Sequence, residues 1–304
     1  MTSLRFPSPM RVIVRDWLNA NQVLFLGAET TLIDTGYGDC LDNTLARLRA
    51  PDALGERRLH RIVNTHGHSD HIGGNAALRR LYDCRISVPE GEAPLFAAWD
   101  TRALWLDYAD QQAEPFAFDD VIRAGDILEL GGMAWQALAA PGHDMDAQLF
   151  YCPEERLLIS GDALWANGFG VVLPSEGQVR LAAARATLDT IARLDVRATI
   201  PGHGAPFNDT NAALERAYAR IKAFEADPDR MARNCVRVML MYALLHRRRM
   251  ALADLPAYVE RIEVHREYNA QYFRLPADRY AEMLVTDLVK AGAARCENGW
   301  LLPA

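Results

Sequence analysis

Four residues that can bind metal ions lie within six positions of the segment RIVNTHGHSDHIGG, residues 61–74. They are His66, His68, Asp70 and His71. Side chains spaced this closely cannot all project from one side of a helix or strand, so we predict a loop at the end of a strand that turns back on itself. In such a loop His66 and His68 can face one metal ion and the other two residues a second. Neutral imidazole with carboxylate suits zinc, and also iron or manganese.

The alternative for this loop is a solvated polar turn. The chain has only eight histidines in 304 residues, however, and three of them lie beside an aspartate within six positions. A chance distribution would rarely place them so, which argues against the polar turn.

The H-x-H-x-D-H pattern resembles the signature of the metallo-β-lactamase superfamily. The family has three further ligands in later turns, and these match His143 in PGHDMD, Asp162 in ISGDAL and His203 in IPGHG, in the family's order and each after an apolar run. The resemblance covers roughly residues 10–205. The resemblance implies two divalent metal ions per chain, with zinc the first choice. One metal would be bound by His66, His68 and His143, the second by Asp70, His71 and His203, and Asp162 would bridge them.

The same resemblance implies a hydrolytic reaction in which a hydroxide bridging the two metals attacks the substrate. Asp70 would accept a proton from this nucleophile. Asp34, in the segment LIDTG, matches an acidic position that in the family supports the metal ligands. Its alternative role is to cap the turn before Gly36.

The elements expected to position these residues are short strands and helices. Runs rich in Val, Ile, Leu and Phe predict strands on both sides of the metal-binding loop, and residues 39–50, 75–82 and 180–194 have helical patterns. The resemblance implies an α+β fold, a four-layer αββα sandwich. We assign it to residues 1–209.

From residue 210 to residue 304 the pattern is mainly helical, and Asn298-Gly299 predicts a terminal hairpin. Helices followed by a small hairpin resemble a winged-helix module, which some hydrolases of the superfamily carry. Residues 205–304 hold 15 Lys and Arg against 13 Asp and Glu, so their net charge is only +2. We therefore favour a role in the substrate cleft or in a homodimer interface over nucleic-acid binding.

Aromatic residues near the ligands are candidates for a substrate-binding wall. Trp99 and Trp105 lie in a segment that interrupts the strands, and Trp165 and Phe169 follow Asp162. Apolar side chains of this kind line most concave ligand sites. The alternative is that each simply packs in the core.

Composition limits the remaining possibilities. The net charge is −7, of which residues 1–204 carry −9, and an acidic surface repels polyanions. The five cysteines have no C-x-x-C spacing, which argues against a disulfide framework or a cysteine zinc site. The sequence lacks a long apolar run and a signal-peptide pattern, so we expect a cytoplasmic protein without a membrane segment.

We therefore predict a metallohydrolase that acts on a small thioester, ester or lactone. Superfamily members that open β-lactams typically have Cys or Ser in place of Asp162 and are exported, so antibiotic hydrolysis is not the expected activity. No basic cluster in the sequence matches the glutathione site of glyoxalase II. Two alternatives stay open: a nuclease or phosphodiesterase that uses the same site, and an oxidoreductase of the persulfide dioxygenase type with a single iron.

Overall fold

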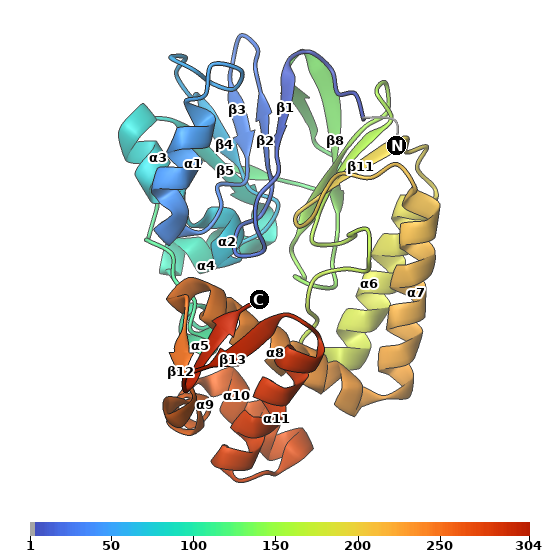
Figure 1. Cartoon of the computed structure of the whole chain (residues 1–304). Coiled ribbons are helices and arrows are strands. Elements are labelled where there is room, and N and C mark those ends of the chain that lie inside the picture. The colour runs from blue at the N-terminus through green and yellow to red at the C-terminus, as the bar shows by residue number, and fades with distance from the viewer. Residues whose placement is uncertain (1–3) are drawn as a thin grey trace.

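The structure is a computed structural model that describes residues 4–304. Two β-sheets face each other, helices cover their outer faces, and a mainly helical part follows at the C-terminal end (Figure 1). The first sheet has the order β1-β2-β3-β4-β5-β6 and the second β11-β10-β9-β8-β7. The strands of the first sheet are β1 (Met10–Ile13), β2 (Gln22–Phe25), β3 (Thr31–Ile33), β4 (Arg61–Val63), β5 (Arg85–Pro89) and β6 (Asp120–Ile122). Those of the second are β7 (Ile127–Leu130), β8 (Met133–Ala139), β9 (Gln148–Cys152), β10 (Leu157–Gly161) and β11 (Ala198–Pro201).

Alternating burial along the strands explains why the sheets stack. In β8, Met133, Trp135 and Ala137 are buried, and they belong to a core cluster that also contains Val23 and Ile33 of the first sheet. Side chains of a strand point alternately to its two faces, so one face of each sheet can fill the shared core.

Helices cover the outer faces. Helices α1 (Leu41–Leu48) and α3 (Asn75–Tyr82) pack on the first sheet through Leu48 and Leu78. Helices α6 (Gly177–Ala192) and α7 (Thr210–Ala226) pack on the second sheet through Leu188 and Leu214. The predicted αββα sandwich is therefore confirmed.

All four segments that carry candidate ligands follow strands that end at the same edge of the sandwich. The metal-binding loop follows β4. His143 follows β8, Asp162 follows β10 and His203 follows β11. Strand β10 is parallel to β11 and antiparallel to β9, which is antiparallel to β8, so β8, β10 and β11 run in one direction.

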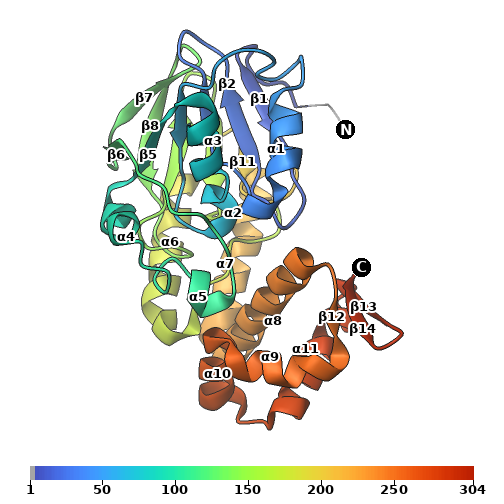
Figure 2. The same ribbon diagram turned by 90° about the vertical axis from the view of Figure 1, so that its left-hand side faces the viewer.

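The C-terminal part forms a helical unit with its own small sheet (Figure 2). It contains the helices α8 (Pro228–Arg247), α9 (Leu255–Arg261), α10 (Glu263–Tyr268) and α11 (Ala277–Lys290). Its strands β12 (Met250–Ala251), β13 (Ala294–Glu297) and β14 (Trp300–Pro303) pair in the order β12-β14-β13. The predicted hairpin is confirmed, with both Asn298 and Gly299 at positive φ. The mainly helical character of this part is also confirmed. The division at residue 210 stays a prediction. Helix α7, which begins there, packs on the second sheet of the sandwich.

Within residues 4–304, none of the helices combines the length and hydropathy that crossing a bilayer requires. The cytoplasmic location stays a prediction.

His265 gives the C-terminal part a pH-dependent stability. The residue is fully buried in α10, with its Nδ1 atom 3.3 Å from the Tyr280 hydroxyl oxygen. Burial lowers the pKa of the imidazole to about 4, because a charged ring loses its hydration there. In the unfolded chain the ring binds a proton below about pH 6.5. Stability from this source is therefore complete above that pH and falls as the pH drops from about 6.5 to about 4, by about 3 kcal/mol in total.

Urea unfolding of the metal-free protein at about pH 7.5 and at about pH 5 measures this loss. We expect the parent protein to lose about 2 kcal/mol more than His265→Phe between the two conditions. Equal losses in both proteins would show that His265 does not titrate on unfolding.

Candidate metal centre

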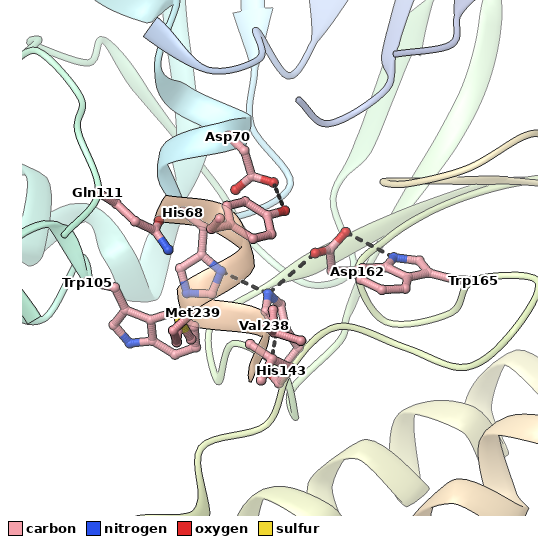
Figure 3. A pocket seen from close by; sticks show the side chains of 11 residues that line it. His68, Asp70, Trp105, Gln111, His143, Asp162, Trp165, Val238 and Met239 are labelled. Carbon is pink, nitrogen blue, oxygen red and sulfur yellow. Dashed lines mark hydrogen bonds and ion pairs between the residues drawn. The ribbon is translucent and has the colours of Figure 1, made fainter. Parts of the chain in front are cut away.

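Seven candidate ligands meet at the edge where the strands end. Their donor atoms form three overlapping groups, and within each group the atoms lie within 4.8 Å of one another. The groups are His66, His68 and His143; Asp70, His71 and His203; and His66, His71 and Asp162. All seven residues are buried. In Figure 3, His68 and Asp70 of the metal-binding loop converge with His143 and Asp162 of two later segments.

Donor atoms from different segments of the chain lie close together. His68 Nδ1 is 2.8 Å from His143 Nε2, and His203 Nε2 is 2.9 Å from Asp70 Oδ2. The Nε2 atoms of His66 and His71 are buried and have no hydrogen-bond partner within the part of the chain that is described. Buried polar atoms are normally paired, and a cation that accepts their lone pairs would satisfy these two. The residues therefore fit a metal site.

The metal-binding loop turns as predicted, with a short helix inside it. After β4 the chain runs through Thr65 to Gly67 and enters α2 (Ser69–Ile72), which carries Asp70 and His71. Gly67 donates its backbone N–H to Glu92 Oε1 at 2.6 Å. A Cβ atom on Gly67 would lie 2.6 Å from the same oxygen, so only glycine fits between the two histidines that flank it.

Asp34 lies behind His71. Its Oδ2 atom is 2.7 Å from His71 Nδ1, which leaves Nε2 of that ring to face the other ligands. The carboxylate also accepts hydrogen bonds from Thr65 N at 2.9 Å and from Thr65 Oγ1 at 2.8 Å. Asp34 has φ of +57°, a costly conformation that these three bonds hold in place. These are the contacts that a ligand-supporting role requires, and that role stays a prediction.

The protonation states of His66, His68 and Asp162 at neutral pH suit metal binding. Burial, followed by repulsion from neighbouring histidines, lowers the pKa of His66 and of His68 well below the ordinary value. Burial alone would raise the pKa of Asp162, but His203 and His71 hold it well below the ordinary value. Neutral imidazole and ionised carboxylate are the forms that coordinate metals. His71 differs: burial alone would lower the pKa of its ring, but Asp34 and the carboxylates of the centre raise it well above the ordinary value, so a metal ion would have to displace its proton.

Three of the four aromatic residues predicted to bind substrate lie close to this centre. The Trp105 ring lies 4.0 Å from the His68 ring, between centroids. Trp165 donates its Nε1–H to Asp162 Oδ1 at 3.1 Å, and Phe169 lines an adjacent cavity. Trp99 instead packs edge-on against Phe116, with ring centroids 5.8 Å apart. A substrate-binding role stays a prediction for all four.

Two residues at the centre were not predicted from the sequence. The Tyr242 hydroxyl, on α8, donates to Asp70 Oδ2 at 3.0 Å and lies 3.3 Å from His203 Nε2. Trp17 stacks on the His203 ring at 5.6 Å with an interplanar angle of 3°. Tyr242 lies in the apolar run VMLMYALL, so its sequence context indicated core packing.

Gly202 gives a direct test of how tightly the centre is packed. A Cβ atom there would lie 2.1 Å from Asp162 Oδ1. We expect Gly202→Ala to displace this carboxylate and to weaken metal binding about tenfold, the low end of the effect of disturbing a ligand's surroundings. Metal titration of the variant measures the change. In the control Gly27→Ala, the nearest atom would be 3.5 Å away and the affinity is expected to stay at the parent value. A parent-like affinity in Gly202→Ala would contradict this geometry.

Comparisons with known proteins agree on the family. The Metallo-beta-lactamase superfamily profile matches residues 15–203. A hydroxyacylglutathione hydrolase of Hyphomonas neptunium is 32% identical over 111 residues, which cover 36% of each protein. The match to this curated relative therefore spans about a third of its length.

Solved structures show the same fold. A metallo-beta-lactamase family protein from Thermus thermophilus matches 97% of this chain and 98% of its own, with a TM-score of 0.54 and 22% identity. A beta-lactamase domain protein from Burkholderia ambifaria matches 99% of this chain and 94% of its own, with a TM-score of 0.57 and 19% identity. The family profile covers more than half of the chain, and the chain therefore belongs to the metallo-beta-lactamase superfamily.

Proposed function

We propose that the protein is a dinuclear metallohydrolase that cleaves a small thioester, ester or lactone. The observation that carries the proposal is the convergence of seven buried donor residues into groups that share members, because a structural metal site is normally closed and mononuclear. The metals would be held by His66, His68, Asp70, His71, His143, Asp162 and His203. Zinc is the first choice for this ligand set, and iron or manganese would also fit.

Bound divalent ions supply Lewis acidity and make water acidic enough to ionise near neutral pH. The protein's own groups then orient the reactants and handle protons. Asp70 has one oxygen close to both His203 and Tyr242, and its carboxylate is placed to take the proton of the attacking water. Trp105 and Trp165 border the space in front of the ligands.

Thioester cleavage has additional support from the relatives, because hydroxyacylglutathione hydrolases match about a third of this chain. The structure also offers apolar walls beside the centre, which suit an acyl substrate. We therefore rank thioesters first among the candidate bonds.

A probe panel tests the proposal. Thioester, lactone and phosphodiester probes are incubated with protein whose metal content has been measured. Hydrolysis of a thioester or lactone, lost on chelation and restored by zinc, is the expected result. Hydrolysis of the phosphodiester alone would favour the nuclease, and one iron per chain without hydrolysis would favour the persulfide dioxygenase type.

Tyr242 is predicted to assist the reaction by fixing Asp70. The change Tyr242→Phe removes one hydroxyl that donates to a carboxylate and retains the ring. Hydrogen bonds to charged groups contribute about 1.5–3 kcal/mol, so we expect kcat/KM to fall by at least about tenfold with both metals retained. The control Tyr218→Phe removes a hydroxyl that bonds Asp189 on the surface. Equal kcat/KM values for Tyr242→Phe and the parent would exclude the role.

We further propose that residues 210–304 act as a winged-helix-like module that completes the substrate site. Helix α8, strand β12, helices α9 to α11 and the final hairpin follow one another in the order of such a module. Tyr242 reaches the metal ligands from α8, which supports a role in binding a small molecule over one in binding nucleic acid. A homodimer through this module is a further possibility that gel filtration tests.

A further inference from the structure

A cavity of about 480 Å³ between α7 and α8 is lined by five arginines and one carboxylate. The arginines are Arg216, Arg220, Arg230, Arg233 and Arg237, and the carboxylate is Asp287. This concentration of positive charge lies in a protein whose net charge is −7. It belongs to no part of the metal centre.

Four of the five arginines lack a counterion. Arg233 pairs with Asp287 at 2.5 Å, but none of the others has a carboxylate oxygen within 4.0 Å among residues 4–304. Arg216 and Arg220 donate instead to the backbone oxygens of Ala166 and Phe169. These bonds fix the guanidinium groups without neutralising them.

The arginines therefore repel one another. Burial lowers the pKa of Arg220, and repulsion from Arg237 and Arg230 lowers it further. Holding four like charges around one cavity costs free energy that an anion would recover. Such an arrangement marks a binding site for a strongly charged anion.

The arginine cavity is connected to the metal centre. It shares Arg220 and Asn234 with an apolar cavity of about 450 Å³. That cavity in turn shares Trp165, Val238 and Tyr242 with the space in front of the metal ligands. Trp165 and Val238 are labelled beside this space in Figure 3. Asn234, Val238 and Tyr242 of α8 follow one another at intervals of four, so they lie along one face of the helix. Asn234 and Tyr242 are about 12 Å apart along its axis.

This inference rests on the proposed hydrolase and names its substrate class. We propose that the substrate is an acyl thioester whose thiol bears phosphate groups, as in coenzyme A. The thioester carbonyl would lie at the metal ligands, an uncharged arm would pass through the apolar cavity, and the phosphates would lie among the arginines. Water adds to the carbonyl carbon, the C–S bond breaks, and the products are a carboxylic acid and the phosphate-bearing thiol, whose sulfur receives a proton.

The charges and the apolar walls favour this class over two others. A single carboxylate would leave most of the four guanidinium groups unpaired, whereas phosphates accept bidentate hydrogen bonds from several arginines. A nucleic-acid strand carries a phosphate at every nucleotide and needs cations along its whole path. Between Asn234 and Tyr242 the wall is formed by apolar residues such as Val238 and Met241.

The test compares two thioesters that share the scissile bond. Acetyl-coenzyme A carries phosphates, and S-acetyl-N-acetylcysteamine does not. We expect the parent protein to prefer acetyl-coenzyme A in kcat/KM. In Arg237→Gln and in Arg220→Gln the preference should fall by about 10- to 100-fold, through KM, because each loses a charge-assisted hydrogen bond to phosphate. The control Arg279→Gln alters an exposed arginine that pairs with Glu282 on α11 and should keep the parent preference.

Calorimetry with ADP gives a readout that does not depend on hydrolysis. ADP binding that is lost in Arg237→Gln and kept in Arg279→Gln supports the anion site. Equal kcat/KM for the two thioesters in the parent, or no ADP binding, overturns the inference and leaves the hydrolase standing. Protein with two bound metals that hydrolyses neither thioester, nor any ester or lactone probe, overturns the proposed function, and the ADP result then stands alone. A single-stranded RNA that displaces ADP and is itself cleaved would overturn the inference by assigning the arginines to nucleic acid.

Discussion

Replacement of Asp162 by alanine is expected to remove at least one metal ion per chain and to abolish most hydrolysis. Asp162 has one oxygen 3.6 Å from His71 Nε2 and the other 3.5 Å from His143 Nε2, so the carboxylate lies between the two predicted metal positions. It is buried, and alanine would leave the surrounding histidines without this charge. Loss of a residue that merely supports a ligand costs about 10- to 100-fold in metal affinity or activity, so loss of a shared ligand should exceed about 100-fold in kcat/KM.

Metal analysis and thioester kinetics on purified Asp162→Ala measure both effects. Asp195→Ala is the matched control, because Asp195 lies on the surface and pairs with Arg156, an interaction worth about 1 kcal/mol or less. Two metals per chain with parent-like kcat/KM in Asp162→Ala would refute the bridging role.

Asparagine at position 34 is expected to weaken metal binding by about 10- to 100-fold, the range measured for groups that orient metal-bound histidines. The substitution keeps the size of the side chain and suits the positive φ of Asp34, which asparagine tolerates. It removes the negative charge that His71 Nδ1 contacts at 2.7 Å. The His71 ring then loses its strongest orienting partner, whereas the Thr65 N–H can still donate to the oxygen of the amide side chain.

Zinc titration against a competing chelator gives the affinity of Asp34→Asn. Asp83→Asn is a close control, because Asp83 also has positive φ, at +50°, but lies at the surface beside Arg58. If Asp34→Asn bound zinc as tightly as Asp83→Asn, Asp34 would have only the turn-capping role that its position before Gly36 also allowed.

The candidate ligands could be predicted from the sequence because each one follows an apolar strand. A residue that directly follows a strand lies at the edge of the sheet. Four strands that end at one edge therefore bring together residues that are far apart in the chain. His66 and His203 lie far apart in the chain, yet both belong to the same set of overlapping, buried donor groups. The αββα layers were implied by the resemblance to the superfamily, with which the predicted strands and helices agreed.

The surroundings of the centre could not be predicted in the same way. Tyr242 is 172 residues from Asp70 in the chain, and their contact depends on how α8 packs against the sandwich. The arginine cavity could not be predicted from the sequence for a different reason. Its five arginines are spread over residues 216–237 and two helices, and acidic residues elsewhere reduce the net charge of residues 205–304 to +2. An average charge carries no information on which side chains face one another.

The metal content per chain tests the central claim most directly. Protein purified without added metal, and again after exposure to zinc, would be analysed by mass spectrometry for all first-row metals. The seven converging donor residues predict two divalent ions per chain. Chelation should remove both ions and abolish thioester hydrolysis. A single ion per chain that stays single in excess zinc would contradict the dinuclear centre and the hydrolytic function built on it.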